Sequence, residues 1–66
     1  MSWFNCEDGN DRGLCAFETI EEAMAHAEID PKVMEIWEYE EDEDGYIGDA
    51  IGCVWKMKGW NGFNGN

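Results

Sequence analysis

The fold is decided by TIEEAMAHAEIDP, residues 19–31. Thr19 is a good helix N-cap, and Glu22 three residues later completes a capping box. Asp30-Pro31 ends the pattern, because the residue before a proline is pushed out of the helical region. The stretch therefore predicts one helix over residues 20–29. Its apolar residues recur at helical spacing and predict a buried stripe made of Ile20, Ala23, Met24 and Ala27.

Two segments typical of β-strands lie on each side of this helix. The first two are joined by a Gly/Asn-rich turn cluster, and the last two by an acidic tip that ends in Asp44-Gly45, a pair favoured in hairpin turns. The predicted strands are residues 2–6, 14–17, 33–39 and 46–58.

The order β-β-α-β-β predicts an α+β fold. We expect a two-layer domain over residues 1–58, in which a four-stranded, mostly antiparallel sheet carries the helix on one face. The Gly/Asn-rich residues 59–66 are predicted to be a flexible tail. One sheet face stays open, for a partner or a second copy to cover. In the last strand, the period of two predicts a shared face for Ile51, Cys53, Trp55 and Met57.

Charge is the strongest functional signal in the sequence. The chain has sixteen Asp and Glu residues and four basic residues, for a formal net charge of −12. The basic residues are Arg12, Lys32, Lys56 and Lys58. Self-repulsion of this size destabilises the folded state, which suggests that the charge has a use. It argues against direct binding to nucleic acid or an anionic membrane. It favours a basic protein surface, such as that of a nucleic-acid-binding enzyme, although solubility alone is the alternative explanation.

The start of the chain carries no signal of export. Residues 1–10 contain neither a basic segment nor an apolar run, and no stretch approaches the length of a membrane span. These features predict a cytoplasmic protein, in the host cytoplasm if the chain is phage-encoded. Cysteines stay reduced there.

Catalytic chemistry is not expected. The single histidine, His26, lies off the apolar stripe and one turn after Glu22, so a solvated residue with a mild ion pair to that glutamate is predicted. A catalytic histidine needs a nucleophile and an orienting carboxylate in a pocket, and the sequence offers neither as a recognisable set. We therefore predict a protein that is not an enzyme, with no catalytic residues and no cofactor.

A metal site is not predicted either. Cys6, Cys15, Cys53 and His26 lack the Cys-x-x-Cys spacing of zinc sites. The cysteines are expected to be small buried apolar groups, with Cys6 and Cys15 facing each other across the first hairpin. Residues 40–51 resemble a calcium loop, but Ile51 stands where a bidentate Glu is needed and the flanks are strand-like. Weak binding of calcium at this acidic tip is a minor alternative.

The acidic strand and turn form the predicted binding site. From Glu35 to Asp49 there are eight acids and no base. If the strand continued through Asp42, alternate carboxylates would share one face with a repeat of about 6.5–7 Å, comparable to the spacing of nucleic-acid phosphates. Aromatic rings beside them would anchor a partner. The predicted partner-binding residues are Glu35, Trp37, Glu38, Tyr39, Glu40, Glu41, Asp42, Glu43 and Asp44. The competing interpretation is a solvated hairpin whose charges prevent edge-to-edge aggregation.

Residues 16–23, Ala-Phe-Glu-Thr-Ile-Glu-Glu-Ala, continuing to Ala27-Glu28, are similar to the strand–Thr-cap–helix segment of a short phage inhibitor of bacterial RNA polymerase. The small, acidic αβ chain also resembles phage-encoded proteins that block host enzymes or defences, some by imitating DNA. This resemblance implies an inhibitor or adaptor that occupies a basic site of a nuclease, CRISPR effector, restriction enzyme or polymerase. The alternative is a self-assembling, dimeric structural module whose charge serves solubility.

Overall fold

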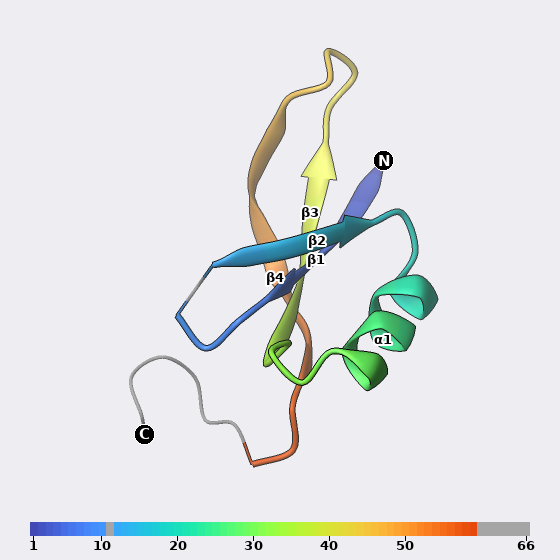
Figure 1. Ribbon diagram of the computed structural model, residues 1–66. Coiled ribbons are helices and arrows are strands. Elements are labelled where there is room, and N and C mark those ends of the chain that lie inside the picture. Colours follow the sequence, from blue (N-terminus) through green and yellow to red (C-terminus); the bar gives the residue numbers. More distant parts are fainter. Residues whose placement is uncertain (11, 60–66) are drawn as a thin grey trace.

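The computed structural model describes residues 1–10 and 12–59. It contains four strands and one helix in the predicted order (Figure 1). The predicted tail, apart from Gly59, lies outside the described residues. The elements are β1 (Ser2–Glu7), β2 (Gly13–Phe17), α1 (Ile20–Ile29), β3 (Glu35–Glu41) and β4 (Ile47–Lys56).

The four strands form one open antiparallel sheet in the order β2-β1-β3-β4. The predicted α+β fold is confirmed. β1 is central and pairs with both β2 and β3, so α1 carries the chain over β1 from one side to the other. The β3–β4 hairpin extends beyond the part of the sheet that α1 covers (Figure 1).

The helix begins as its sequence predicts. The Thr19 hydroxyl accepts a hydrogen bond of 3.2 Å from the Glu22 amide and lies 3.0 Å from the Glu22 carboxylate. Ala23 is fully buried, whereas Met24, predicted to be buried, is 40 % exposed. The buried stripe of the helix is narrower than predicted because α1 packs mainly against β1 and β2. The buried core is small and consists of Cys6, Ala23, Val33 and Ile36, flanked by Phe4, Leu14, Phe17, Ala27 and Trp55.

Both hairpins close with the same hydrogen-bond pattern around an aspartate. In the β1–β2 turn, Asp8 Oδ1 accepts from the amides of Asn10 and Arg12 at 2.8 and 3.1 Å. In the β3–β4 turn, Asp42 Oδ1 accepts from the amides of Asp44 and Tyr46, both at 2.9 Å. In each turn the Asp amide also donates to the carbonyl four residues later, at 3.0 Å to Arg12 and 2.9 Å to Tyr46. Aspartate side chains favour such local contacts, which fix both turns.

The predicted single face of β4 is wrong. Ile36 pairs with Trp55, but its neighbour Trp37 pairs with Cys53, so Val54 is an extra residue in β4. Residues directly opposite each other in an antiparallel pair have their side chains on the same face. Trp55 therefore lies on the helix side with Ile36, and Cys53 lies on the other side with Trp37. This β-bulge interrupts the period of two, and two further register shifts follow in the β3–β4 ladder, between Glu38 and Tyr39 and between Tyr39 and Glu41.

Candidate functional site

The predicted binding residues are divided between the two sheet faces and the turn. β3 alternates along its length, so Glu35, Trp37, Tyr39 and Glu41 lie on the face opposite α1. Cross-strand pairing places Glu38 opposite Phe4 and Glu40 opposite Ser2, on the helix side. The rings of Trp37 and Tyr39 were predicted to lie beside Glu38 and Glu40. They lie instead on the opposite face of the sheet. We call the face that carries Trp3, Trp37 and Tyr39 the aromatic face.

The predicted carboxylate row ends earlier than expected. β3 stops at Glu41, and Asp42 turns its carboxylate onto the amides of its own turn. Glu40 Oε1 receives a hydrogen bond of 3.0 Å from the N-terminal ammonium, and its Oε2 receives one of 3.0 Å from the Ser2 hydroxyl. These two contacts, the ammonium first, lower the pKa of Glu40 below its ordinary value. Asp42 and Glu40 therefore have structural partners within the chain.

Four other acids of this region present unpartnered carboxylates. Within residues 1–10 and 12–59, no hydrogen bond or ion pair engages the side chains of Glu38, Glu43, Asp44 and Asp49. Glu43, Asp44 and Asp49 are exposed, and Glu38 is half-buried. These four carboxylates are available to a partner molecule.

The lysines and arginines lie away from the densest group of acids in the fold. Seven acids lie between Glu38 and Asp49, and the only cation near them is the N-terminal ammonium. We call this segment the hairpin end; it lies at the top of Figure 1. All lysines and arginines lie toward the opposite end, where β2 begins, α1 leads into β3, and β4 finishes. They are Arg12, Lys32, Lys56 and Lys58.

On the aromatic face, each large ring donates a hydrogen bond to a carboxylate. Trp3 Nε1 donates to Glu41 Oε1 at 2.8 Å, and Trp37 Nε1 donates to Glu35 Oε1 at 2.9 Å. The Tyr39 hydroxyl donates to Glu7 Oε2 at 3.1 Å. The Trp3 and Tyr39 bonds join β1 to β3, whereas the Trp37 bond lies within β3. Together the three bonds hold the rings in place, so the face is ordered before a ligand binds.

Two of these three carboxylates are buried. Glu7 is 3 % exposed and Glu35 is 1 % exposed, and the two are direct partners in the β1–β3 register. Glu7 Oε2 also accepts from Asn5 Nδ2 at 3.0 Å. Buried carboxylates need such donors, because an unpaired charge in a protein interior is strongly unfavourable. Glu35 was predicted to touch a partner; instead its carboxylate supports Trp37.

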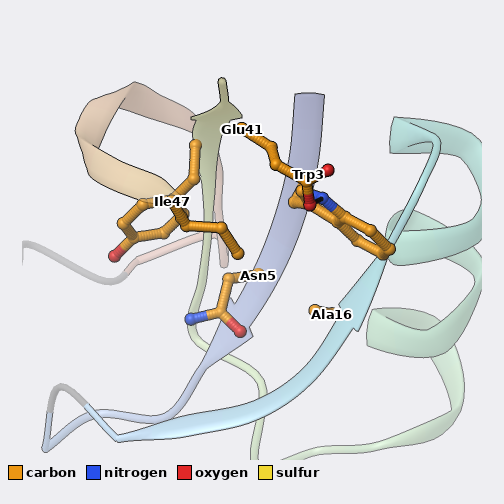
Figure 2. A pocket seen from close by; sticks show the side chains of 6 residues that line it. Trp3, Asn5, Ala16, Glu41 and Ile47 are labelled. Atoms are coloured by element: carbon orange, nitrogen blue, oxygen red, sulfur yellow. Dashed lines mark hydrogen bonds between the residues drawn. The ribbon is translucent and has the colours of Figure 1, made fainter. Parts of the chain in front are cut away.

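A hollow of about 420 Å³ opens on the aromatic face at the hairpin end. Its lining is largely apolar, and Glu41 supplies the only carboxylate. Figure 2 shows Trp3 and Asn5 projecting from β1, with the Glu41 side chain reaching toward the indole nitrogen. Ile47 enters from β4 and Ala16 from β2. The full lining is Trp3, Asn5, Ala16, Tyr39, Glu41 and Ile47.

Four of these lining residues were not among the predicted site residues: Trp3, Asn5, Ala16 and Ile47. A signal was present, because Trp3, Asn5 and Glu7 alternate with Phe4 and Cys6 in β1, as expected of a strand with two different faces. That alternation does not tell which strand lies beside β1. Pairing of β1 with β3 is what brings Trp3 opposite Tyr39.

The cysteines differ in environment. Cys6 and Cys15 are direct partners across the β1–β2 hairpin, as predicted, and all three cysteines are free thiols. Cys15 lies on the edge strand β2 and is exposed, and Cys53 is half-buried, so the expectation of buried cysteines holds for Cys6 only. Burial, followed by the proximity of Cys15 and Asp30, raises the pKa of Cys6 to about 11. Burial also raises the pKa of Cys53.

His26 has a different partner from the predicted Glu22. The residue is half-buried, whereas a solvated residue was predicted. Its Nε2 lies 3.3 Å from Asp30 Oδ2 but has no hydrogen-bond partner among the described residues, and its ring packs on Phe17 with a centroid separation of 5.5 Å. The Glu22 carboxylate is engaged with the Thr19 cap instead. Among the described residues, no group of three or more Cys, His, Asp or Glu side chains is arranged to hold a metal ion. No helix in that part of the chain is long and apolar enough to cross a membrane.

Comparison with protein-family models, curated protein sequences and solved structures finds no match to this chain. Its function is therefore inferred from the chemistry of its own surfaces.

Proposed function

We propose that this chain is a protein-binding inhibitor or adaptor, without catalytic activity of its own. It places its hairpin end on a basic site of a nucleic-acid-handling protein, of the class of nucleases, restriction enzymes, CRISPR effectors or polymerases. The observation that carries the proposal is the uneven distribution of charge, with seven acids at the hairpin end and every lysine and arginine toward the other end. Such a distribution orients the chain as it approaches a cationic surface.

The unpartnered acids carry the electrostatic part of this proposal. Glu43, Asp44 and Asp49 are exposed on the turn and the start of β4. Their charges act on encounter with a basic groove, whereas the rings of the aromatic face contribute to the lifetime of the complex. Nucleic acid competes for the same groove, because phosphates bind it through the same charge.

The test is capture from a bacterial lysate on the immobilised chain, at low and at high salt, with bound proteins identified by mass spectrometry. We expect one stoichiometric nucleic-acid enzyme, which added DNA or RNA displaces. Recovery of the chain alone, or of a set of basic proteins without a defined stoichiometry, would contradict the proposal.

A pair of variants separates local charge from total charge. Glu43→Gln/Asp44→Asn removes two unpartnered acids from the hairpin end. Asn10→Lys/Glu28→Gln alters the formal net charge by the same two units away from that end, at two exposed positions. We expect the first pair to weaken binding to the captured enzyme about tenfold at low salt and less at high salt. Equal weakening by both variants would show that only total charge matters.

Self-assembly is the second candidate function. It is favoured by apolar side chains on β4, which is an edge strand of the sheet: Ile47 is 55 % exposed and Ile51 is 58 % exposed. A long edge strand with such side chains is a template for pairing with another chain. Sedimentation of the wild type, Ile51→Lys and Trp37→Ala tests this function. A wild-type dimer lost in either variant supports it, and a monomer at all concentrations excludes it.

A further inference from the structure

We infer that the hollow on the aromatic face binds the guanidinium group of an arginine side chain supplied by the basic partner. This inference deepens the proposed function and rests on it for the identity of the partner. The hollow itself stands on separate observations, namely its lining, its hydrogen bonds and its place in the fold.

The volume and lining of the hollow suit a flat or extended organic group. Its volume of about 420 Å³ falls within the range of roughly 300–1,000 Å³ that is usual for small-ligand sites. An indole and a phenol ring line it from neighbouring strands, since Trp3 and Tyr39 are direct partners in the β1–β3 register. The alkyl part of a long side chain would be buried against these rings and Ile47.

The charge of the hollow selects a cation. Glu41 supplies the only carboxylate in the lining. Its Oε1 accepts from the Trp3 indole, and within residues 1–10 and 12–59 no hydrogen bond engages its Oε2. Aromatic faces attract cations, and the surrounding chain carries a formal net charge of −12. A nucleobase could also stack on the rings, but its phosphates would be repelled by this charge.

Arginine fits these features better than lysine does. Its guanidinium is planar, stacks on aromatic rings and pairs with a carboxylate through several N–H groups at once. It is also more weakly hydrated, so its entry into an apolar hollow is less unfavourable. The Asn5 side-chain carbonyl, in the same lining, supplies a neutral acceptor for a remaining N–H.

The side chains that line the hollow are fixed by hydrogen bonds before a ligand binds. Glu41 Oε1 fixes the Trp3 indole, while the Glu41 amide donates to the Met1 carbonyl at 2.7 Å. Glu7 Oε2 accepts hydrogen bonds from the Tyr39 hydroxyl and from the Asn5 side-chain amide, which holds both side chains in place. Preorganised side chains lose little conformational freedom on binding, which favours affinity for a small group.

The probe is N-acetyl-arginine methylamide, added to the full-length chain and followed by two-dimensional amide NMR. Its neutral, near-isosteric citrulline counterpart is the control ligand. We expect saturable shifts of the Trp3 indole N–H and of the Asn5, Ala16 and Ile47 amides, with affinity on the order of millimolar, which is usual for one side chain. Equal shifts with citrulline, or tighter binding of the corresponding lysine derivative, would overturn the assignment to a guanidinium.

The matched variants are Glu41→Gln and Glu43→Gln. Glu41→Gln keeps an acceptor for the Trp3 indole and removes the charge from the hollow, whereas Glu43→Gln removes the same charge from the exposed turn. We expect the first variant to weaken arginine binding about fivefold or more, and the second less than twofold. The NMR spectrum of each variant also reports whether it is folded. Equal losses, or shifts confined to residues 42–44, would overturn the inference.

These outcomes are independent of the test of function. If arginine fails to bind the hollow but Glu43→Gln/Asp44→Asn still weakens binding to the captured enzyme, the inference is wrong and the proposed function stands. If arginine binds the hollow but no nucleic-acid enzyme is captured, the proposed function is wrong and the site remains.

Discussion

The indole nitrogen of Trp3 donates a hydrogen bond of 2.8 Å to Oε1 of Glu41. The two residues are 38 positions apart in sequence, and the bond joins the first strand of the sheet to the end of the third. It defines one wall of the hollow and places a carboxylate at its rim. Two other rings on the aromatic face are held in the same way, by Glu35 and Glu7.

Loss of the Glu41 acceptor should destabilise the fold. In Glu41→Ala the half-buried Trp3 indole has no acceptor, and we expect the free energy of unfolding to fall by about 1–2 kcal/mol. Glu41→Gln retains an acceptor and should lie close to the wild type. Urea denaturation followed by tryptophan fluorescence measures both. Equal losses would mean that the charge, and not the hydrogen bond, stabilises this contact.

Asp42 should behave as a structural residue of the turn. Asp42→Ala removes the acceptor for the amides of Asp44 and Tyr46, and we expect it to reduce stability by about 1–2 kcal/mol. Asp42→Asn keeps an oxygen acceptor and should restore most of this stability. Thermal denaturation of the pair is the measurement. A stable Asp42→Ala variant with weakened partner binding would instead assign Asp42 to the interface.

Gly45 is required by the conformation of the same turn. Its φ of +85° lies in the left-handed region, although no atom lies within 4 Å of the position that a Cβ would take. Gly45→Ala should therefore cost about 1–2 kcal/mol through backbone strain alone. Gly48→Ala is the control, since Gly48 also has open space around it and is not among the positive-φ glycines. Similar stability of the two variants would contradict this explanation.

The contact of Glu40 with the N-terminal ammonium should be detectable in the titration of the Glu40 carboxyl group. Because the folded chain has the lower pKa, this group stabilises the fold above the ordinary glutamate pKa of about 4.3, and the contribution is lost as the pH falls through the folded value. Acetylation of the N-terminus, or Ser2→Ala, should raise the pKa of Glu40. Carboxyl NMR resonances followed from neutral to acidic pH measure it. An unchanged pKa after acetylation would exclude the ammonium as the main cause.

The three thiols should react at different rates. Cys15 is exposed, whereas the buried Cys6 has a pKa of about 11 and is almost entirely protonated at mildly alkaline pH. The thiolate is the reactive form, so an aromatic disulfide reagent should modify Cys15 first and Cys6 last in the native protein. Peptide mapping by mass spectrometry gives the order, and all three should react alike in denaturant. Early modification of Cys6 would show that α1 opens readily.

Much of the fold could be predicted because its signals are local. The Thr19 cap, the proline at position 31 and the glycine at position 45 each act within a few residues, and the helix bounds are those predicted. The strands at Val33 and Tyr46 were predicted to begin slightly early; Val33 is part of the core but precedes the strand. Each of these features depends on backbone preferences that neighbouring residues alone decide.

The candidate site was predicted only in part. The acidic hairpin was identified, and Glu43 and Asp44 lie exposed on it, but the rings that were expected beside the carboxylates lie on the other face. His26 pairs with Asp30 rather than Glu22, because the capping threonine already holds Glu22. The bulge at Val54 has no signal in the alternation of β4, because the register of β4 is set by pairing with β3.

Local sequence patterns specify the elements of this protein, their order, the positions of the two hairpin turns and the excess of negative charge. Three features appear only in the folded chain: β1 lies between β2 and β3, all lysines and arginines lie away from the hairpin end, and the Trp3 indole contacts Glu41. The difference arises because helix caps and turns are set by contacts a few residues apart. The arrangement of strands, and every surface built across them, is set by long-range pairing and by burial of a small shared core.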